Sequence, residues 1–326
     1  MKVIVIGLGS MGKRRIRLIM KYDPLIHIVG IDTSAERRKE AEALFPVKTY
    51  ADMAKISFDE EIECAFIATS PLSHNNIISE CLTNGWHVFT ELNLVADGYD
   101  ENILKAKENN LTLFLSSTFL YREEINYIDK KIKDISGPLN YVYHVGQYLP
   151  DWHPWEDYTG YFVSDKRTNG CREILAIELP WITEVFSNIK HVSAVKRKNT
   201  TLKIDYPDSY LLTLEHENGN AGLLAVDVVS RKAVRNLEIY GEDIYLSWDG
   251  TPNGLFQYDL AAKTNINIEL YQEIDKQSEY ASFVIENAYL NEITEFFEIL
   301  KNPDNKQRYG FEKDLEIIKV IDRIEG

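Results

Sequence analysis

A short apolar run followed at once by three regularly spaced glycines constrains the fold of this chain more than any other feature. Residues 3–7 read VIVIG, and Gly7, Gly9 and Gly12 keep the GxGxxG spacing. The apolar run is typical of a parallel strand covered on both faces, and the periodicity of residues 11–22 predicts a helix. In such a strand–turn–helix unit, backbone N–H groups at the helix start face the diphosphate of a dinucleotide. The residues expected there are Gly7, Gly9, Ser10, Met11 and Gly12.

An acidic residue follows the next expected strand, residues 26–31. Asp32 lies twenty residues after Gly12, at the position from which a carboxylate hydrogen-bonds the adenosine ribose of a bound dinucleotide. A 2′-phosphate beside this carboxylate would meet like-charge repulsion, so the sequence favours NAD over NADP. Hydroxyl and guanidinium groups that follow closely keep NADP open as an alternative: Thr33, Ser34, Arg37 and Arg38.

Strand-like and helix-like segments alternate through the first third of the chain. After the first unit, the sequence predicts strands over 26–31, 64–69, 87–90 and 112–116, and helices over 35–44, 73–84 and 97–108. Regular alternation implies right-handed crossovers and a doubly wound parallel sheet. We therefore expect an α/β Rossmann domain for binding NAD(P) over residues 1–120.

The pattern changes over residues 121–326. A helix over 122–132 precedes a long strand over 140–149, and turn-forming residues then separate several strand-like segments. A helix is expected over 172–186, although Pro180 should kink or shorten it. Helices over 283–300 and 312–324 end the chain. This pattern predicts an α+β domain, for substrate binding and oligomerisation, with a large open and mostly antiparallel sheet.

The overall charge and the cysteines restrict the setting of the protein. The formal net charge of −15 argues against nucleic acid or an anionic membrane as a partner, because no basic surplus neutralises phosphates. The start of the chain is too short and broken for a signal peptide, and no apolar run approaches the ~20 residues of a membrane span. Three cysteines without CxxC spacing are expected to be free thiols in a reducing cytoplasm.

Two further motifs accompany the glycine turn at matching intervals. Residues 68–74 read ATSPLSH, and residues 90–93 read TELN. Together with the glycine turn they resemble the glucose–fructose oxidoreductase/inositol dehydrogenase/MocA (Gfo/Idh/MocA) family, in which the corresponding motifs are A-T-P-N-x-x-H and E-K-P. The resemblance implies hydride transfer at a secondary alcohol of a sugar, polyol or nucleotide sugar by a dimer or tetramer. It also implies four further residues at the cofactor: Thr69, Ser70, His74 and Glu91.

The sequence departs from this family at both of its usual proton-handling positions. Leu92 stands where the family has the lysine of E-K-P. On the helix that usually carries D-x-G-x-H-x-x-D, aligning Glu173 with the first acid places Ile177 on the histidine and Pro180 on the last acid. Leucine and isoleucine do not titrate, so the family's catalytic lysine and histidine have no counterparts here.

Residues 149–158, LPDWHPWEDY, supply candidates for the missing proton transfer. His153, oriented by Asp157, is expected to act as the general base, with Tyr158 in reserve, because these groups titrate and follow the long strand. Trp152 and Trp155 offer flat faces on which sugar rings stack. The alternative is a self-packed loop or a subunit contact.

A polar stretch just beyond this loop is expected to bind substrate. Lys166, Arg172 and Glu173 lie at a loop-to-helix junction, where basic side chains and N–H groups would hold a diphosphate or carboxylate. The alternative is a solvated basic loop. The seven histidines lack metal-ligand spacing, so no metal site is expected.

These features lead to one main hypothesis and two alternatives. The main hypothesis is an NAD(P)-dependent oxidoreductase acting on the CH–OH group of a sugar, amino sugar or nucleotide sugar, in surface-glycan synthesis. Because Leu92 and Ile177 do not titrate, a catalytically silent NAD-binding sensor or scaffold is the first alternative. A reductase of C=N or C=C bonds, whose substrate or solvent supplies the proton, is the second.

Overall fold

The computed structural model describes residues 1–56, 61–153, 156–277 and 284–326. These residues form two compact units. The first comprises Met1–Ser117 and Tyr289–Leu315, and the second comprises Thr118–Ala288 and Glu316–Gly326. The chain passes from the first unit to the second after Ser117 and returns to the first unit for residues 289–315.

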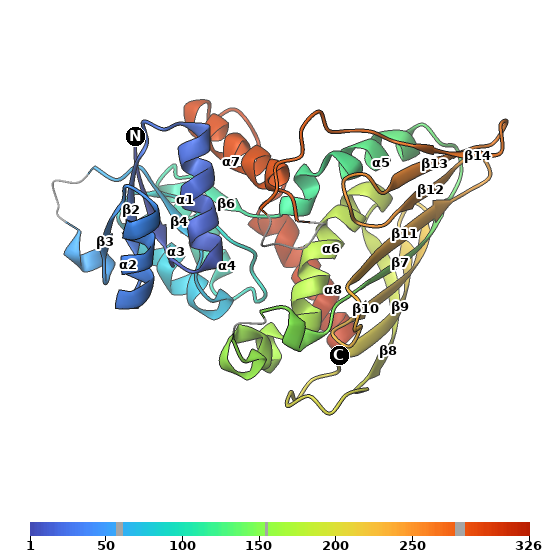
Figure 1. Ribbon diagram of the computed structural model, residues 1–326, viewed down its shortest axis with the longest axis horizontal. Helices are drawn as coiled ribbons and strands as arrows, with labels where there is room; N and C mark the ends of the chain where they lie inside the picture. The colour runs from blue at the N-terminus through green and yellow to red at the C-terminus, as the bar shows by residue number, and fades with distance from the viewer. Residues whose placement is uncertain (57–60, 154–155, 278–283) are drawn as a thin grey trace. The chain divides into compact units, whose positions relative to one another are not determined.

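The first unit contains a six-stranded parallel sheet in the order β3-β2-β1-β4-β5-β6 (Figure 1). This topology confirms the predicted Rossmann sheet. The strands β1, β4, β5 and β6 are almost entirely buried, which explains their continuous apolar sequences. The strand β3 was not predicted, because it is a three-residue edge strand without a buried face. The strands are β1 (Lys2–Ile6), β2 (His27–Ile31), β3 (Lys48–Tyr50), β4 (Cys64–Ile67), β5 (His87–Thr90) and β6 (Leu113–Leu115).

Helices cover this sheet, including one from the far end of the sequence. In α7, Phe296 is fully buried and meets the rings of Phe66, Phe89 and Phe114 at centroid distances of 5.3, 5.5 and 5.6 Å. These aromatic contacts attach α7 to the three strands β4, β5 and β6. The helical segments are α1 (Ser10–Tyr22), α2 (Ala35–Leu44), η1 (Met53–Lys55), η2 (Pro71–Ser73), α3 (His74–Thr83), α4 (Tyr99–Glu108) and α7 (Glu286–Lys301).

The second unit contains an eight-stranded sheet in the order β14-β13-β12-β11-β7-β10-β9-β8. Every neighbouring pair is antiparallel except β7 and β10. The predicted large, mostly antiparallel sheet is therefore confirmed. The strands are β7 (Asn140–Gly146), β8 (Ile189–Arg197), β9 (Ser209–His216), β10 (Ala221–Asp227), β11 (Val234–Tyr240), β12 (Tyr245–Trp248), β13 (Leu255–Asp259) and β14 (Thr264–Asn267).

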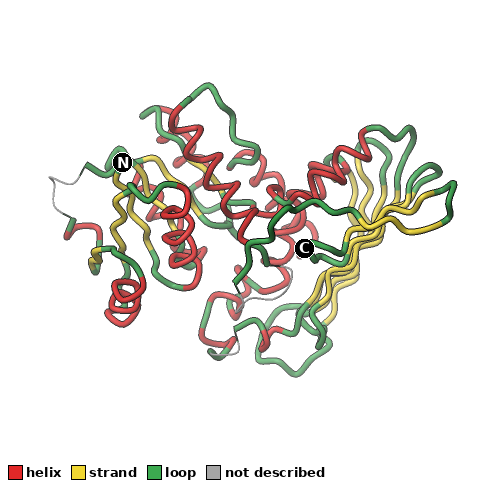
Figure 2. Tube along the Cα trace, turned by 45° about the horizontal axis from the view of Figure 1, so that its top comes forward, coloured by secondary structure: helices red, strands yellow, loops and turns green. Residues whose placement is uncertain are grey.

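One face of this sheet carries the helices of the second unit (Figure 2). The helix α6 runs unbroken through Pro180, so the predicted shortening is wrong. Burial compensates for the hydrogen bond that proline removes, since Trp181 and Phe186 of the following turns are fully buried. The helical segments are η3 (Thr118–Tyr121), α5 (Glu123–Lys133), η4 (Leu149–Asp151), η5 (Tyr158–Gly160), η6 (Phe162–Ser164), η7 (Lys166–Thr168), α6 (Gly170–Phe186) and α8 (Phe311–Glu325), of which the part from Glu316 onward belongs to this unit.

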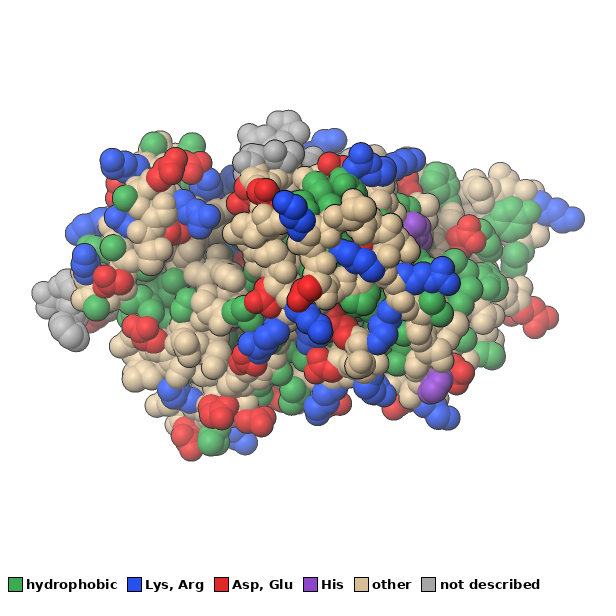
Figure 3. All heavy atoms as spheres, turned by 90° about the horizontal axis from the view of Figure 1, so that it is seen from below, with side chains coloured by type: hydrophobic (Ala, Val, Ile, Leu, Met, Phe, Trp, Pro, Cys, Tyr) green, Lys and Arg blue, Asp and Glu red, His purple; other side chains and the backbone are tan. Residues whose placement is uncertain are grey.

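The opposite face of the same sheet is exposed and partly apolar. Val195 pairs with Leu211, and Val142 pairs with Leu223, so each pair lies on one face across adjacent strands. Their exposed fractions range from 38% for Val142 to 55% for Leu211. On the molecular face drawn in Figure 3, acidic and basic side chains are interspersed with apolar ones. In the part of the chain that is described, none of the helices has the length and apolar character of a membrane span.

Candidate functional site

The glycine turn after β1 depends on close backbone packing. Gly7 has φ of +90°, and a Cβ there would lie 2.4 Å from the carbonyl oxygen of Ala68. A Cβ on Gly12 would lie 1.8 Å from the carbonyl oxygen of Gly7. Any larger side chain at either position would therefore displace backbone, so these two glycines are required by the close packing of the turn.

Gly9 has a different environment, because a Cβ added there meets nothing within 4 Å. Gly9 is also the N-cap of α1, where no side chain among the described residues caps the helix and the first turn carries no acid. Open space and an uncapped helix N-terminus thus coincide. This arrangement fits the diphosphate of a dinucleotide, which needs both room near the backbone and N–H donors.

The Asp32 carboxylate is held at the end of β2. One oxygen accepts a hydrogen bond from the backbone N–H of Leu8 at 2.8 Å, and the other accepts from the N–H of Ser34 at 2.8 Å. Arg37 lies 3.9 Å away as a weak ion-pair partner. Backbone donors on both sides fix the carboxylate next to the glycine turn, where it suits the adenosine ribose.

The loop after β4 is ordered by its own polar side chains. Thr69 and Ser73 share a hydrogen bond of 2.8 Å, and the Ser70 carbonyl accepts from the Ser73 hydroxyl at 2.6 Å. The buried His74 ring bridges the side chain of Asn93, at 2.6 Å, and the Thr69 carbonyl, at 3.0 Å. Burial lowers the pKa of His74, which favours the neutral ring. The neutral His74 ring therefore supports the expected cofactor loop by contacting the backbone carbonyl of Thr69.

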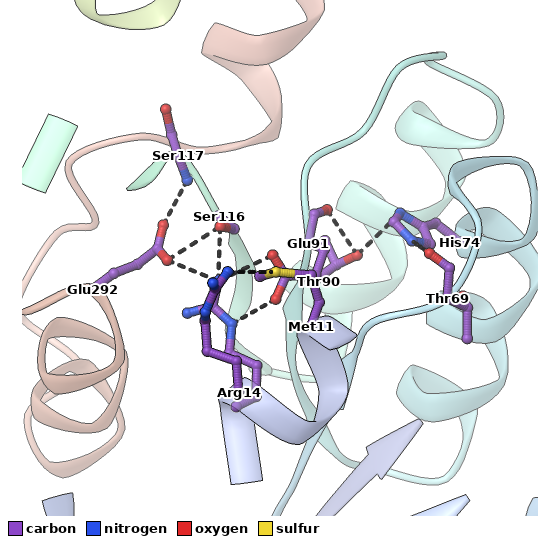
Figure 4. A network of polar contacts seen from close by, with 10 residues as sticks. Met11, Arg14, Thr69, His74, Thr90, Glu91, Ser116, Ser117 and Glu292 are labelled. Atoms are coloured by element: carbon purple, nitrogen blue, oxygen red, sulfur yellow. Dashed lines mark hydrogen bonds and ion pairs between the residues drawn. The ribbon is translucent and has the colours of Figure 1, made fainter. Parts of the chain in front are cut away.

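Glu91 lies at the end of β5, on the same sheet edge as this loop (Figure 4). Its two carboxylate oxygens accept from Nε and Nη2 of Arg15 at 2.5 and 3.0 Å. The Glu91 side chain is 14% exposed, whereas Arg15 is fully buried. The next residue, Leu92, is half-buried and stands at the position of the family's lysine. The structure thus fixes a carboxylate, with no titrating neighbour at position 92, at the carboxyl edge of the sheet.

In the second unit, the aromatic loop is organised differently from the prediction. His153 Nδ1 lies 2.7 Å from Glu156 Oε1, and its ring stacks on Tyr161 at 4.7 Å. Asp157 instead accepts from the N–H and hydroxyl of Thr159, both at 2.9 Å. The expectation that Asp157 orients His153 is therefore wrong, because a local turn takes that carboxylate and leaves Glu156 as the histidine's partner.

Two other predicted residues of this loop have structural contacts, and one falls outside the description. Trp152 donates its indole N–H to the Gln147 carbonyl at 3.0 Å. The Tyr158 hydroxyl accepts from the backbone N–H of Lys203 at 3.0 Å, which ties it to a neighbouring loop. Trp155 lies outside the described residues.

Arg172 does not face a substrate anion. It is 5% exposed and binds two carboxylates of α8, Asp322 at 2.7 Å and Glu325. These contacts contradict its predicted role, because the guanidinium charge is already matched within the unit. Lys166, by contrast, is exposed on η7 and lines a shallow hollow together with Lys203.

Glu173 has the environment of a functional acid. Its Oε2 atom is buried and has no hydrogen-bond partner among the described residues, and the same holds for the hydroxyl of Tyr161. Burial raises the pKa of Glu173 to about 7. Burial and the Glu173 carboxylate also raise the pKa of Tyr161. The sequence placed Glu173 in this region but gave no sign that its carboxyl group is desolvated.

The cysteines and the potential metal ligands complete the survey of reactive groups. Cys64, Cys81 and Cys171 are buried free thiols, and burial raises the pKa of each. Across the described ranges, no group of three or more His, Cys, Asp or Glu side chains is arranged to hold a metal ion.

The parallel sheet, the glycine turn with open space at Gly9 and the carboxylate at the end of β2 define a dinucleotide-binding Rossmann domain. Residues 1–115 match the GFO_IDH_MocA family, described as "Oxidoreductase family, NAD-binding Rossmann fold". This part of the chain is therefore similar to an NAD-binding oxidoreductase family, and its cofactor is of the NAD type. Both the family resemblance and the predicted cofactor are confirmed.

Similarity to known proteins extends over nearly the whole chain. Myo-inositol 2-dehydrogenase of Thermotoga maritima is 24% identical over 318 residues, covering 93% of this chain and 89% of that protein. Levoglucosan dehydrogenase in complex with NADH has a similar structure, with TM-score 0.80, 16% identity and coverage of 99% and 95%. UDP-N-acetylglucosamine 3-dehydrogenase from Acidithiobacillus ferrooxidans gives TM-score 0.74, 17% identity and coverage of 100% and 96%. At these identities the two solved structures establish a shared fold.

Proposed function

We propose that this protein is an NAD-dependent oxidoreductase that interconverts a secondary alcohol and a ketone on a sugar, amino sugar or nucleotide sugar, in surface-glycan synthesis. The observation that carries the proposal is the glycine turn, where open space at Gly9 meets an uncapped helix N-terminus beside Asp32. The substrate class is supported by the relatives, which act on inositol, levoglucosan and a nucleotide sugar.

In this proposal each cofactor residue has one task. The N–H groups of Ser10 and Met11 bind the diphosphate, and Gly9 leaves room for it. Asp32 accepts hydrogen bonds from the adenosine ribose, and Glu91 accepts them from the nicotinamide ribose. Thr69 and Ser70 line the sheet edge between these positions. The nicotinamide ring supplies the acceptor or donor for the hydride.

The proton that leaves the alcohol oxygen needs an acceptor other than lysine. His153 is the first candidate, since an imidazole can accept a proton and the hydrogen bond to Glu156 fixes the orientation of the ring. Its side chain is 37% exposed, so a substrate can reach it. Asp157 and Tyr158 are weaker candidates, because the Thr159 turn and the Lys203 backbone already hold their polar atoms.

Glu173 is the second candidate for the same step, on an independent observation. A carboxyl group with a pKa of about 7 has both protonation states populated at physiological pH, as a general acid or base requires. Its unpartnered Oε2 lies in the electrostatic neighbourhood of Tyr161, on whose ring His153 stacks. His153 and Glu173 therefore belong to one cluster. Trp152 and Trp155 are proposed as stacking faces for the sugar ring, and Lys166 as a contact for a substrate anion.

The test combines cofactor binding with turnover. NADH fluorescence titration establishes cofactor binding, and absorbance of reduced nicotinamide then follows reaction with panels of polyols, free sugars and nucleotide sugars. We expect turnover with at least one sugar-type alcohol. The variants His153→Ala and Glu173→Gln then identify the proton acceptor through the pH profile of kcat. Tight NADH binding without turnover of any compound in the three panels would contradict the proposal.

The two alternatives predict different outcomes. A silent NAD-binding protein is favoured by Leu92 at the sheet edge, and it predicts cofactor binding without turnover of any substrate. A C=N or C=C reductase predicts that NADH is consumed by imines or conjugated alkenes and that His153→Ala retains full kcat. Product analysis by mass spectrometry separates this reductase from the alcohol dehydrogenase.

The protein is further proposed to act as a homodimer or homotetramer. The support is the open face of the second sheet, where Val142, Val195, Leu211 and Leu223 are exposed in adjacent strands. A second copy packing on this face would bury these side chains. Analytical ultracentrifugation of the native chain and of Leu211→Glu tests it, since a charge in the buried interface would yield monomers.

A further inference from the structure

A buried charge cluster in the first unit joins four segments that are distant in sequence. Arg15 of α1 binds Glu91 after β5, Ser116 after β6 and Glu292 of α7. Arg15 and Glu292 are both fully buried. We call Arg15, Glu91, Ser116 and Glu292 the arginine clamp. Figure 4 shows Glu292, Ser116 and Glu91 converging on one point.

The geometry of the clamp makes Arg15 a fixed support for one carboxylate. Nε and Nη2 of Arg15 meet the two oxygens of Glu91 side by side, which is the planar fork that arginine forms with carboxylates. The guanidinium also lies 4.5 Å above the centre of the Phe89 ring. The Phe89 ring fixes the guanidinium, and the two hydrogen bonds from Arg15 hold the Glu91 carboxylate in one orientation at the sheet edge.

Helix α7 holds Arg15 from the opposite side. Glu292 accepts from Arg15 Nη2 and the Ser116 hydroxyl at 3.0 and 3.1 Å with one oxygen, and from the Ser117 N–H at 2.6 Å with the other. One turn earlier, the Tyr289 ring lies 5.4 Å from the Arg15 guanidinium. Arg15 is thus locked between a carboxylate at the sheet edge and a carboxylate of α7.

One donor of Arg15 takes no part in these contacts. The remaining Nη1 of Arg15 is buried and has no hydrogen-bond partner in the described part of the chain. Buried guanidinium donors are normally satisfied, and an ordered water molecule would satisfy this one.

We propose that Arg15 is a positioning residue for the nicotinamide half of the cofactor and that Glu292 of α7 backs it. The inference rests on the proposed function, in which Glu91 accepts hydrogen bonds from the nicotinamide ribose. Arg15 sets the orientation of that carboxylate, and Glu292 sets the orientation of Arg15. The adenosine half, bound by Asp32 and the glycine turn, does not depend on the clamp.

This division is tested with three ligands that share the adenosine end: NAD⁺, ADP-ribose and ADP. Each is measured by displacement of bound NADH, followed by fluorescence. ADP lacks the second ribose, so it reports on the adenosine half alone. We expect Arg15→Gln and Glu91→Gln to weaken the binding of NAD⁺ and ADP-ribose about tenfold, because a charge-assisted hydrogen-bond pair is lost at the nicotinamide end. The affinity for ADP should change less than about twofold.

Two milder variants and a control sharpen the result. Arg15→Lys keeps the charge without the fork and should weaken ADP-ribose by an intermediate factor. Glu292→Gln leaves the Arg15–Glu91 pair in place and should weaken ADP-ribose about threefold through looser support. Lys13→Gln removes another cation of α1, whose partner Glu40 lies at the surface, and should change none of the three ligands. Circular dichroism and thermal unfolding verify that each variant is folded.

The outcomes separate the inference from the function on which it rests. Selectively weaker binding of NAD⁺ and ADP-ribose supports the clamp. If Arg15→Gln does not fold, the variants Arg15→Lys and Glu292→Gln provide the same test. Equal weakening of all three ligands, or no change, overturns the clamp while the proposed function stands. Absence of NADH binding by the wild-type protein would overturn both.

Discussion

The cofactor region of the first unit and the aromatic loop of the second unit differ in what determines their geometry. At the glycine turn, the critical contacts involve backbone, such as the 1.8 Å clash that a Cβ on Gly12 would make with the Gly7 carbonyl. In the aromatic loop, the critical contacts involve side chains, such as the hydrogen bond between His153 and Glu156.

This difference explains why one region matches its family and the other departs from it. A backbone turn that must admit a diphosphate accepts few sequences, so its motif stays recognisable. A proton-transfer group can come from several side chains on neighbouring loops, provided that it titrates in the right range. Leu92 of the first unit and Ile177 of the second can therefore both be apolar, if His153 or Glu173 takes over the proton.

The largest expected effect separates two glycines of the same turn. Gly12→Ala should abolish NADH binding, by about 10³-fold or more, and lower the unfolding temperature, because its Cβ meets backbone. Gly9→Ala should strongly weaken the binding of NADH, because its Cβ enters the space proposed for the diphosphate. The unfolding temperature should not change, because that Cβ meets no protein atom within 4 Å. Fluorescence titration and calorimetric melting measure both. Equal melting temperatures for the two variants would show that backbone packing does not govern this turn.

On the side of the aromatic loop, His153→Ala should lower kcat by about 10²- to 10³-fold once a substrate is known, as loss of a general base does. NADH affinity should not change. Asp157→Ala is the matched control, since its carboxylate serves the Thr159 turn, and its kcat should stay within about twofold of the wild-type value. Wild-type turnover in His153→Ala would assign proton transfer to Glu173 or to the substrate itself.

Arg172 tests whether a basic residue of the second unit has a structural role. Arg172→Ala should lower the free energy of unfolding by about 2 kcal/mol, because a mostly buried guanidinium leaves two carboxylates of α8 behind. The exposed Lys166 offers the comparison, and Lys166→Ala should change stability by less than about 0.5 kcal/mol. Urea denaturation measures both. An unchanged stability with a raised substrate KM in Arg172→Ala would restore its predicted role as an anion ligand.

Asp32 tests cofactor choice at the adenosine end. Asp32→Asn should weaken NADH about tenfold and narrow the preference over NADPH, because the charge that repels a 2′-phosphate is removed while an oxygen acceptor remains. Parallel titrations with NADH and NADPH give the ratio of the two dissociation constants. A ratio equal to that of the wild-type protein would mean that the neighbouring Arg37 and Ser34 decide the preference.

The last prediction concerns the pH dependence of stability. The folded pKa of Glu173 is raised from 4.5 to about 7, so the native state holds a proton that the unfolded chain has released in this range. Glu173 therefore lowers the free energy of unfolding as pH rises from 4.5 to about 7. Glu173→Gln should remove this loss, so that its free energy of unfolding gains about 3 kcal/mol over that of the wild-type protein between pH 4 and pH 8. The exposed Glu316→Gln should show no such gain.

Much of the first unit was predictable because its signals are local. Apolar runs marked the buried strands, and the glycine spacing with Asp32 marked the cofactor turn before any tertiary contact was known. The edge strand β3 was missed, since its three residues carry no buried face. The return of residues 289–315 to this unit left no local signal, because α7 is attached through Phe296 and Glu292 to strands far away in sequence.

The substrate side was less predictable, because partners there depend on loop conformation. Asp157 and Glu156 are both within four residues of His153, and the sequence does not show which one the Thr159 turn engages. Arg172 was expected at a ligand, yet the end of α8 reaches it from 150 residues away. The desolvation that raises the pKa of Glu173 arises from packing and is invisible in a residue's type.

The arginine clamp also has a consequence for how the chain is made. Arg15 emerges from the ribosome 277 residues before Glu292, an interval of roughly 15–55 s at typical elongation rates. During that interval the guanidinium has no α7 behind it, and the aromatic surface of β4, β5 and β6 that Phe296 later covers stays uncovered. The first unit therefore closes only after α7 has been synthesised, although its glycine turn is among the first segments made.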